Sequence, residues 1–504
     1  MTVDHKIFDL VVIGGGINGV GIAHDAAQRG LSVLLCEQGD LAGATSSASS
    51  KLIHGGLRYL EQYQFRLVKK ALIEREVLLK LAPHIVWPLR FCLPHQQKLR
   101  SQWLIRLGLF LYDHLAAENS FVRSAKVLLG ESSPLLPNFS SAFEYSDAWV
   151  DDARLVIINA LAAQQCGATI LTHCQCVSAQ SIHLAKQSQP VWQLQLQNGL
   201  SRQQVVGKTV INAAGPWVNQ VAETVFAVQP SYQVRLIKGS HIVVPRIHQQ
   251  EKAYILQNTD GRVVFVLPFQ RDFSLIGTTD IEQHQLDKIQ ISPTEIQYLL
   301  DVVNGHFKQT VTAADIVHSF SGVRPLFEDP QAKGQGKAQQ LSRDYLIHAQ
   351  QQANLPPLYT IYGGKVTTYR KLAEQAVDCL SAHFDDLRPS RTATSVLPGG
   401  DIQSHAELIG QIQQQYPFLS TDLAKRYAQS YGSLAFHFLT GAESLTDLGI
   451  DFGCGLHQAE VDYLTKHEWA RTAEDILWRR TKLGLYFSPA QIQALADYLA
   501  AKVN

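Results

Sequence analysis

The chain has 504 residues, 46% of them hydrophobic and 17% charged, which is enough material for about three globular domains. Its 44 basic and 44 acidic residues balance, so the composition excludes a protein that binds nucleic acid through bulk positive charge. Seven scattered cysteines exclude a disulfide framework, and no stretch of about 18 apolar residues is present to span a membrane. Because the first expected strand leaves no room for a signal peptide, we expect a cytoplasmic protein.

The first 37 residues have the pattern of a βαβ unit. We expect two buried parallel strands, over 8–13 and 31–36, joined by a helix that begins after Gly14-x-Gly16-x-x-Gly19. Glycine at 14 permits the tight turn, at 16 it lets the backbone approach a pyrophosphate, and at 19 it lets the helix pack on the strand.

Glu37 directly follows the second expected strand. A carboxylate at this place accepts a hydrogen bond from a ribose hydroxyl and repels a 2′-phosphate, while the helix N-terminus offers N–H groups to phosphates. The strand, the turn, the helix and the acidic residue follow one another at the spacing of the dinucleotide-binding motif. The pattern therefore predicts a dinucleotide site rather than an ordinary glycine-rich turn.

The rest of the chain divides by the kind of element that its pattern predicts. Helices alternate with strands at first, short strands with hairpin-sized links follow, and helices fill the end. We therefore expect an α/β fold with a Rossmann-like dinucleotide-binding domain, an antiparallel β substrate (cap) domain and a C-terminal α-helical domain. The expected boundaries are 1–83, 146–234 and 316–388 for the dinucleotide-binding domain, 84–145 for a cap insertion, 235–315 for the antiparallel domain and 389–504 for the helical domain.

Several individual elements can be bounded from the pattern. An amphipathic helix over 65–81 is stopped by Pro83, and a second helix is expected over 151–166. The expected strands of the antiparallel domain are 236–244, 253–256, 262–267 and 273–277, and a late strand over 358–362 precedes a late helix over 367–380.

Three further segments favour FAD over NAD. The loop 45–51 carries five hydroxyl groups and Lys51 between two apolar elements, where a flexible serine linker is the weaker interpretation. A strand ends in Ala213-Ala214-Gly215, which resembles a second short motif of FAD-binding oxidoreductases. Gly363-Gly364-Lys365 follows a strand and opens a helix, so it brings N–H groups and a cation to one place, although it is also compatible with an ordinary helix start.

These residues carry a family resemblance that runs from the first strand to the helical tail. The chain resembles the aerobic, FAD-dependent glycerol-3-phosphate dehydrogenases of bacteria, which are membrane-associated and reduce quinones. Relatives often carry a hydroxyl residue where this chain has Ala214, which weakens one flavin contact. The matching segments are 12–19, 49–60, 145–155, 235–241, 321–325 and 363–370.

The resemblance implies a set of cofactor and substrate residues. The FAD residues that it implies, together with those of the glycine motif, are Gly14, Gly16, Asn18, Gly19, Glu37, Thr45, Ser46, Ser50, Lys51, His54, Gly215, Gly364, Lys365 and Thr367. The substrate residues that it implies are Arg58, Tyr59, Thr278, Arg324 and Arg343. A phosphate ester needs such cations, although any one arginine considered alone is more often a solvated surface residue.

The chemistry that the resemblance implies is hydride transfer from the secondary carbinol carbon of glycerol 3-phosphate to FAD, which gives dihydroxyacetone phosphate. The catalytic candidates are His241, Arg324 and Lys365. His241 is the candidate general base, with a core histidine as an equally weighted alternative. We expect Arg324 and Arg343 to hold the phosphate and Lys365 to stabilise the reduced flavin.

One apolar segment, 103–112, bears on membrane contact. Together with Lys98, Arg100 and Arg106 it forms a basic, aromatic-edged pattern that suits a helix lying in a membrane interface. Periodicity alone favours a buried core helix over that interpretation. His173-Cys174-x-Cys176 has the residue types of half a metal site, but no matching pair is present elsewhere in the sequence. Buried strand cysteines are the favoured interpretation, so we expect no metal.

The expected partners are glycerol 3-phosphate, ubiquinone or menaquinone, and the lipid surface of the inner membrane, with no nucleic acid. The oligomeric state is left open, with a homodimer as one option. We expect peripheral attachment to the inner face of the cytoplasmic membrane. The alternatives are an amino-acid or amine oxidase of the same flavin superfamily, which would need one arginine for a carboxylate, and a non-catalytic dinucleotide-binding module.

Overall fold

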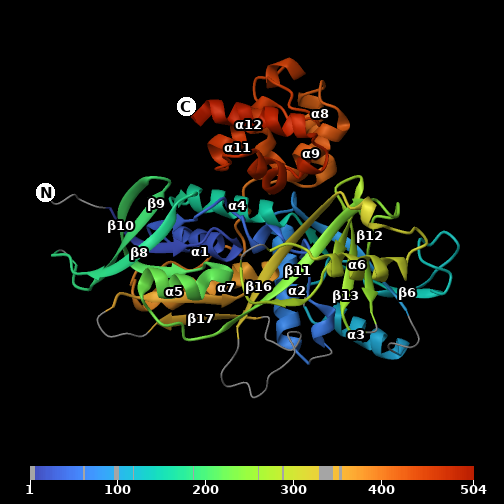
Figure 1. Cartoon of the computed structure of the whole chain (residues 1–504), viewed down its shortest axis with the longest axis horizontal. Helices are drawn as coiled ribbons and strands as arrows, with labels where there is room; N and C mark the ends of the chain where they lie inside the picture. Colours follow the sequence, from blue (N-terminus) through green and yellow to red (C-terminus); the bar gives the residue numbers. More distant parts are fainter. Residues whose placement is uncertain are drawn as a thin grey trace.

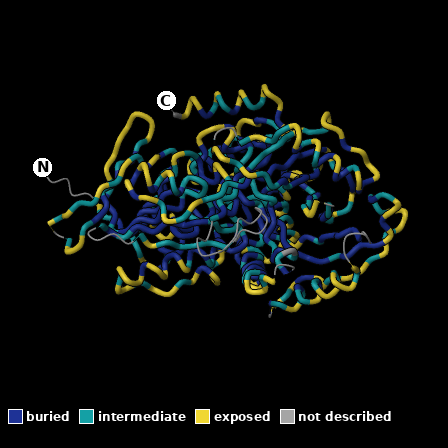
Figure 2. The backbone as a smooth tube through the Cα atoms, turned by 60° about the horizontal axis from the view of Figure 1, so that its bottom comes forward, coloured by how far each residue is buried: buried dark blue, intermediate teal, exposed yellow. Residues whose placement is uncertain are grey.

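The structure is a computed structural model. It describes residues 6–60, 63–95, 101–116, 118–185, 187–258, 260–286, 289–327, 344–350 and 355–503. Within this part of the chain, two sheets lie side by side and a helical C-terminal domain forms a further layer above helix α4 (Figure 1). Buried residues run through the centre of the molecule, whereas exposed ones lie along its rim (Figure 2).

The first sheet has a parallel centre of the dinucleotide-binding kind. β1 (Ile7–Ile13) pairs in parallel with β2 (Val33–Cys36) and with β10 (Ser201–Asn212). β7 (Thr169–Leu171) continues the parallel arrangement beside β2, and β18 (Leu358–Gly363) continues it beside β10. β8 (Gln175–Ile182), β9 (Val191–Asn198) and β17 (Tyr345–Gln350) extend the sheet as antiparallel strands.

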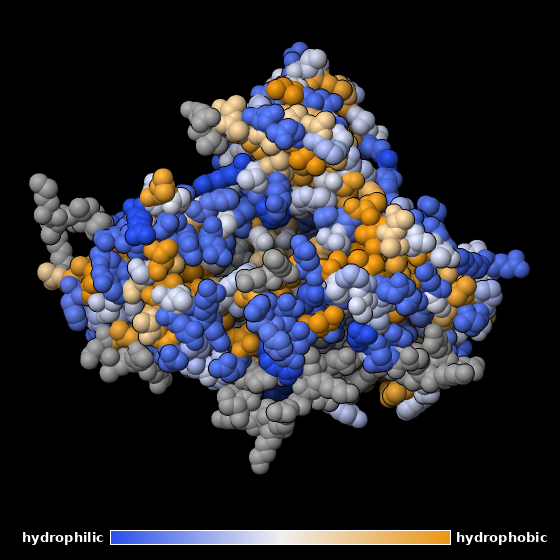
Figure 3. Space-filling view, viewed as in Figure 1, coloured by the Kyte–Doolittle hydropathy of each residue, from blue (hydrophilic) through white to orange (hydrophobic). Residues whose placement is uncertain are grey.

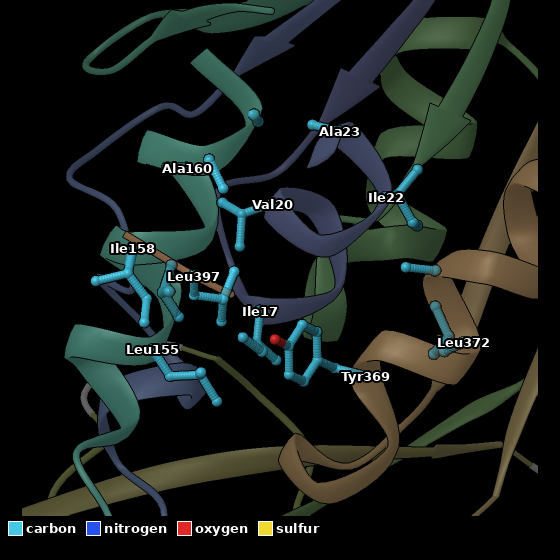
Figure 4. Close-up of a cluster of buried hydrophobic side chains, with 14 of the residues drawn as sticks. Ile17, Val20, Ile22, Ala23, Leu155, Ile158, Ala160, Tyr369, Leu372 and Leu397 are labelled. Atoms are coloured by element: carbon cyan, nitrogen blue, oxygen red, sulfur yellow. The ribbon is translucent and has the colours of Figure 1, made fainter. Parts of the chain in front are cut away.

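Helices cover both faces of this sheet. α1 (Ile17–Gln28) packs between α4 (Asp152–Gln165) and α7 (Tyr369–Asp378), and Figure 4 shows Ile17 and Val20 among side chains from both neighbours. On the other face, α5 (Val218–Phe226) contributes to a cluster that includes Trp192. The parallel centre is thus buried on both sides, as the apolar strand sequences require.

The second sheet is mainly antiparallel. Its strands are β3 (Leu52–Ile53), β4 (Val86–Pro94), β5 (Ala125–Leu128), β6 (Ser141–Val150), β11 (Val234–Pro245), β12 (Lys252–Gln257), β13 (Val263–Phe269), β14 (Phe273–Gly277), β15 (Ile281–Gln283) and β16 (His318–Phe327). α2 (Phe65–Leu81) and α3 (Gln102–His114) pack on one face, and α6 (Pro293–Asn304) packs on the other. Of the four strands expected between 236 and 277, β12, β13 and β14 form the expected meander, but β11 pairs with β14 rather than with β12.

The second sheet differs from the sequence prediction at three places. β16 pairs with β11, so the segment from residue 316 belongs to this sheet up to Phe327, and the dinucleotide fold resumes later than expected. β3 and the end of β6 also lie in it, although their segments were assigned to the dinucleotide-binding domain. β4 and β6 were not predicted as strands. In the case of β6, the strand is buried along nearly its whole length and shows no alternation of polar and apolar residues.

The C-terminal domain is helical, as expected. It contains α8 (His405–Gln415), α9 (Thr421–Tyr431), α10 (Ala435–Leu439), α11 (Gln458–His467) and α12 (Pro489–Val503), and these helices share a core of their own. Thr472 and Asp475 form a capping pair in this domain, because the Asp475 backbone N–H donates to Thr472 Oγ1 and the Thr472 N–H donates to the Asp475 carboxylate. In the view of Figure 3, hydrophobic residues gather beside the base of this domain.

Candidate active site

The glycine turn between β1 and α1 has the predicted conformation. Gly14 has a φ of 113°, which favours glycine, and a Cβ on Gly19 would lie 1.9 Å from the Gly14 carbonyl oxygen, so the helix needs glycine to pack there. The Glu37 carboxylate accepts hydrogen bonds from Gly15 N–H (2.6 Å) and Gly39 N–H (2.8 Å). Burial raises the pKa of Glu37 even though these two N–H groups favour its charged form.

The space around the α1 N-terminus fits a pyrophosphate. Ser46 Oγ lies there and accepts a hydrogen bond from Ile17 N–H (3.0 Å), as an anion would at a helix N-terminus. Asn18 Oδ1 is buried with no partner in the described part of the chain. A Cβ on Gly215, whose φ is 57°, would meet no described atom within 4 Å, so the loop after β10 is open on this side. These features fit FAD.

The loop after β18 closes the same region from the far end of the sequence. Asn18 Nδ2 donates to Gly363 O (3.2 Å), and Gly364 follows with a φ of 102°. His54 N–H donates to Thr367 Oγ1 (3.3 Å), which ties the turn after β3 to the short helix before α7. The structure therefore brings Asn18 and His54 close to Gly364 and Thr367, which lie more than 300 residues later in the sequence.

The hydroxyl-rich loop 45–51 is held mostly by its own side chains. Thr45 Oγ1 donates to Val323 O on β16 (2.6 Å). The buried Lys51 ammonium donates to Asp152 Oδ1 (2.7 Å) and to Ser47 O (3.0 Å). The Lys51 charge is therefore paired with a buried carboxylate, and its expected contact with FAD stays a prediction.

A cavity of about 540 Å³ opens between the second sheet, α2 and α3. Its polar end is lined by Ser50, His54, Tyr59, Thr278, Asp280 and Arg324. Its other end is apolar and is formed by side chains such as Leu104, Ile105 and Leu111 of α3 and Phe265 of β13. One cavity thus combines a site for a small polar molecule with a hydrophobic wall.

The polar end carries cations beside hydrogen-bonding groups. The Arg324 guanidinium donates to the Asp280 carboxylate and to Thr279 O (3.4 Å). A Cβ on Gly239 would lie 2.5 Å from Thr278 Oγ1 and 3.0 Å from Arg324 Nη2, so glycine there leaves room for both. Lys365 Nζ lies 4.0 Å from the centre of the Tyr59 ring.

Two of the expected substrate residues cannot be placed. Arg343 lies outside the described residues, as do Lys98 and Arg100, and the side chain of Arg58 is outside the description as well. Of the expected substrate residues, the structure therefore brings together Tyr59, Thr278 and Arg324.

His241 lies behind the cavity rather than in its lining. Its Nε2 is 3.0 Å from Ser50 Oγ, and its ring stacks on Phe320 with centres 4.9 Å apart. Nδ1 is buried without a partner in the described structure. Burial, with the nearby charges of Lys51 and Arg324, lowers the pKa of His241 to about 3, so the ring is neutral at physiological pH. A neutral Nε2 can accept a hydrogen bond from the Ser50 hydroxyl.

Helix α3 is not the buried core helix that periodicity favoured. Leu109 and Tyr112 are buried, but Trp103 is 71% exposed and Phe110 is 58% exposed. The buried edge is hydrogen-bonded, because the Tyr112 hydroxyl accepts a hydrogen bond from Gly55 N–H (2.8 Å) and donates to the buried Asp147. The helix therefore connects an exposed apolar surface to the turn beside His54. Among the described helices, none is both long and apolar enough to cross a membrane.

Sequence reasoning missed Asp280 and Asp152. Asp280 directly follows the Thr278-Thr279 pair at the end of a strand, and that cluster of polar residues after β14 is the signal that could have found it. Asp152 gave no such signal, because only the fold places its carboxylate against Ser49 and Lys51.

Comparisons with known proteins agree with this geometry. Residues 9–369 match the model of the FAD dependent oxidoreductase family, and residues 390–503 match the C-terminal domain of alpha-glycerophosphate oxidase. The chain belongs to the FAD-dependent oxidoreductase family. FAD is therefore the cofactor of this oxidoreductase, and the site around Gly14, Ser46 and Gly364 is the candidate for holding it.

Several relatives of this oxidoreductase are similar along almost their whole length. A glycerol-3-phosphate dehydrogenase of Pseudomonas aeruginosa is 51% identical, covering 99% of this chain and 96% of the relative. The aerobic glycerol-3-phosphate dehydrogenase of Escherichia coli is 48% identical, covering 97% of both. A D-erythritol 1-phosphate dehydrogenase of Brucella abortus is 45% identical over 97% of both.

A solved relative supports both the fold and the cofactor of this oxidoreductase. The structure of the glycerol-3-phosphate dehydrogenase from Bacillus halodurans, complexed with FAD, superimposes with a TM-score of 0.76 at 27% identity. The superposition covers 99% of this chain and 91% of the B. halodurans chain. The expected fold class, with its FAD-binding, antiparallel and C-terminal helical parts, is therefore confirmed.

Proposed function

We propose that this oxidoreductase converts sn-glycerol 3-phosphate to dihydroxyacetone phosphate and passes the electrons to a membrane quinone. The observation that carries the proposal is the polar end of the cavity, which Thr278 and Arg324 line together with Ser50 and His54, two residues that are expected to contact FAD. Lys365 lies beside this end, with its Nζ 4.0 Å from the ring centre of the lining residue Tyr59. The names of the P. aeruginosa and E. coli relatives support the same substrate. Charge-assisted hydrogen bonds from such cations are worth about 1.5–3 kcal/mol each, which suits a phosphate ester.

FAD, when bound, supplies the acceptor for the hydride of the substrate's secondary carbinol carbon. The chain itself supplies orientation and proton transfer. Arg324 binds the phosphate end, and Asp280 keeps the Arg324 guanidinium at the polar end of the cavity. Lys365 contributes its positive charge beside the flavin. Ser50 Oγ accepts the hydrogen bond of the reacting hydroxyl while its own proton is directed to His241 Nε2. As the hydride leaves, the hydroxyl proton passes to Ser50 Oγ and the proton of Ser50 passes to His241.

This assignment gives His241 the role of a base that acts through Ser50. A histidine whose pKa is about 3 is a weak base, so it takes the proton only as the loss of hydride makes the hydroxyl strongly acidic. Neutral His241 also adds no positive charge that would compete with the cations for the phosphate.

Anaerobic reduction of the bound flavin tests the substrate. We expect glycerol 3-phosphate to bleach the visible flavin absorbance, D-erythritol 1-phosphate to bleach it less efficiently, and amino acids to leave it unchanged. Bleaching by an amino acid but not by glycerol 3-phosphate would show an amino-acid oxidase instead. A chain that binds no flavin would indicate the non-catalytic module.

Electron transfer to quinone is the second part of the proposal, and α3 supports it. The helix exposes Trp103, Leu104, Leu107 and Phe110 together with Arg106, a combination that suits the interface of an anionic membrane. Its inner side lines the apolar end of the cavity. A lipid-soluble quinone could therefore reach the cavity from a membrane that α3 contacts, with the protein attached peripherally to the cytoplasmic leaflet.

Reduction of ubiquinone or menaquinone in vesicles tests this part. We expect rapid quinone reduction by protein that is bound to vesicles made with anionic lipid, and slow reduction when the same quinone is held in vesicles that the protein does not bind. A soluble dye acceptor provides the control, since its reduction does not need the membrane. Equal quinone rates in both kinds of vesicle would refute docking as a requirement.

A further inference from the structure

The C-terminal domain contacts the start of the segment between β2 and β3 through buried ion pairs. We call residues 38–51 the FAD loop. Near its beginning, the Asp40 carboxylate accepts hydrogen bonds from Arg480 Nη1 (2.7 Å) and Nη2 (2.8 Å) and from Arg479 Nε (2.6 Å). Both arginines belong to the C-terminal domain, more than 430 residues away in sequence.

The same domain reaches the end of the FAD loop through α4. Lys482 Nζ donates to both oxygens of Asp151 (2.8 and 2.9 Å), the residue that caps α4. The adjacent Asp152 accepts hydrogen bonds from Ser49 N–H (3.1 Å), Ser49 Oγ (2.7 Å) and Lys51 Nζ (2.7 Å). Two neighbouring carboxylates thus join a lysine of the C-terminal domain to the last residues of the loop.

Most of the groups in these ion pairs are buried, so each charge depends on its partner for compensation. Asp152 and Arg480 are fully buried, and Lys51, Asp40 and Lys482 are at most 5% exposed. Removing one partner leaves an uncompensated charge in a low-dielectric environment, so the remaining group must move toward water. The loss of one pair therefore displaces the loop end that the pair holds.

Between its two ends the loop contacts β16, where Thr45 Oγ1 donates to Val323 O. A cavity of about 570 Å³ separates the loop residues Thr45 and Ser47 from Trp478 of the C-terminal domain. On its other side, the middle of the loop carries Ser46, which lies at the α1 N-terminus. The loop is therefore fixed at both ends by the C-terminal domain while its middle faces the candidate FAD site.

We propose that the C-terminal helical domain is a clamp that holds the FAD loop in its FAD-binding conformation, with Arg479, Arg480 and Lys482 as positioning residues. The proposal rests on the FAD site proposed above. If the C-terminal domain holds the loop in advance, FAD does not bear the entropic cost of ordering it. If the loop is released, the affinity for FAD is reduced to the fraction of time that the loop still spends in its FAD-binding conformation. By reciprocity, FAD binding must also strengthen the docking of residues 470–485.

A lysine variant with a matched control tests the clamp. In Lys482→Met the chain loses the charge that pairs with Asp151, and Lys482→Arg restores it. The control is Arg426→Met, because Arg426 pairs with buried Glu460 wholly inside the C-terminal domain. FAD is titrated into each apoprotein, and amide hydrogen exchange over 470–485 is followed with and without FAD.

We expect Lys482→Met to weaken FAD binding at least tenfold, Lys482→Arg to recover most of it, and Arg426→Met to stay within twofold of the parent while its unfolding temperature falls. FAD should slow exchange over 470–485 in the parent and much less in Lys482→Met. If Lys482→Met does not fold, Arg479→Met, at a more exposed position, carries the same test.

Unchanged affinity in Lys482→Met, or an equal loss in Lys482→Met and Arg426→Met, would overturn the clamp. Ser46→Ala separates this failure from a wrong FAD site. Weakened binding in Ser46→Ala with unchanged binding in Lys482→Met refutes the clamp alone. Unchanged binding in Ser46→Ala removes the loop from the FAD site, and the clamp proposal falls with it.

Discussion

Replacing Phe110 by serine tests whether α3 is the membrane-contact surface. Phe110 is 58% exposed, and a fully buried aromatic side chain removes about 200 Å² from water, so membrane insertion buries about 115 Å² of it. At about 25 cal/mol per Å², this contact is worth about 3 kcal/mol, or about a hundredfold in the vesicle partition coefficient. Phe110→Ser should therefore lose most vesicle binding, as measured by cosedimentation with vesicles that contain anionic lipid.

The matched control for this experiment is Leu200→Ser. Leu200 is fully exposed and lies in the turn between β9 and β10, at the opposite end of the molecule from α3 (Figure 1). It should bind vesicles like the parent, and both variants should keep their activity with a soluble dye acceptor. Equal vesicle binding by parent, Phe110→Ser and Leu200→Ser would refute the reasoning and move the contact surface elsewhere, the C-terminal helices first.

Three further predictions concern the site and its stability. Arg324→Ala should lose about 2–4 kcal/mol of transition-state stabilisation, and an unaltered kcat/KM with normal FAD content would contradict its role. Lys365→Met should make the flavin harder to reduce, so redox titration should give a lower midpoint potential; an unchanged potential would exclude a charge effect. Burial, with nearby Arg154 and His405, lowers the pKa of His84 to about 3. Below pH about 6.5 the unfolded chain binds a proton at His84 that the folded chain does not, so the free energy of unfolding decreases as the pH is lowered. Between pH 7.5 and 5.5 the unfolding free energy, measured with urea, should decrease by about 1.4 kcal/mol less in His84→Phe than in the parent. An equal decrease in both proteins would refute this.

Local patterns were enough to predict the first part of the site. The turn at Gly14 and the helix α2 depend on contacts within a few residues, and α2 begins and ends where the sequence predicted because Pro83 follows an amphipathic stretch. The meander of β12, β13 and β14 was recognised for the same reason, since short links favour the pairing of neighbouring strands. The pairing of β11 with β14 instead of β12 was not predicted.

The remaining features depend on contacts between distant parts of the chain. β16 could not be assigned to the second sheet from its own residues, because its pairing partner β11 lies about 80 residues earlier. The exposure of α3 depends on what covers it, which a helical period does not reveal. Asp280 gains a role only once the fold places its carboxylate against Arg324.

The pairing of β1 also constrains the synthesis of the protein. β1 is complete at residue 13, yet its neighbour β10 ends at residue 212 and the next parallel strand, β18, ends at residue 363. At about 5–20 residues per second, the ribosome needs roughly 20–70 s between β1 and β18. Until β10 is complete, roughly 10–40 s after β1 at this rate, the first strand has β2 beside it on one edge and an unpaired edge on the other. A nascent chain of this protein therefore depends on late residues to cover an early apolar strand, and chaperones that bind such strands should meet it before FAD does.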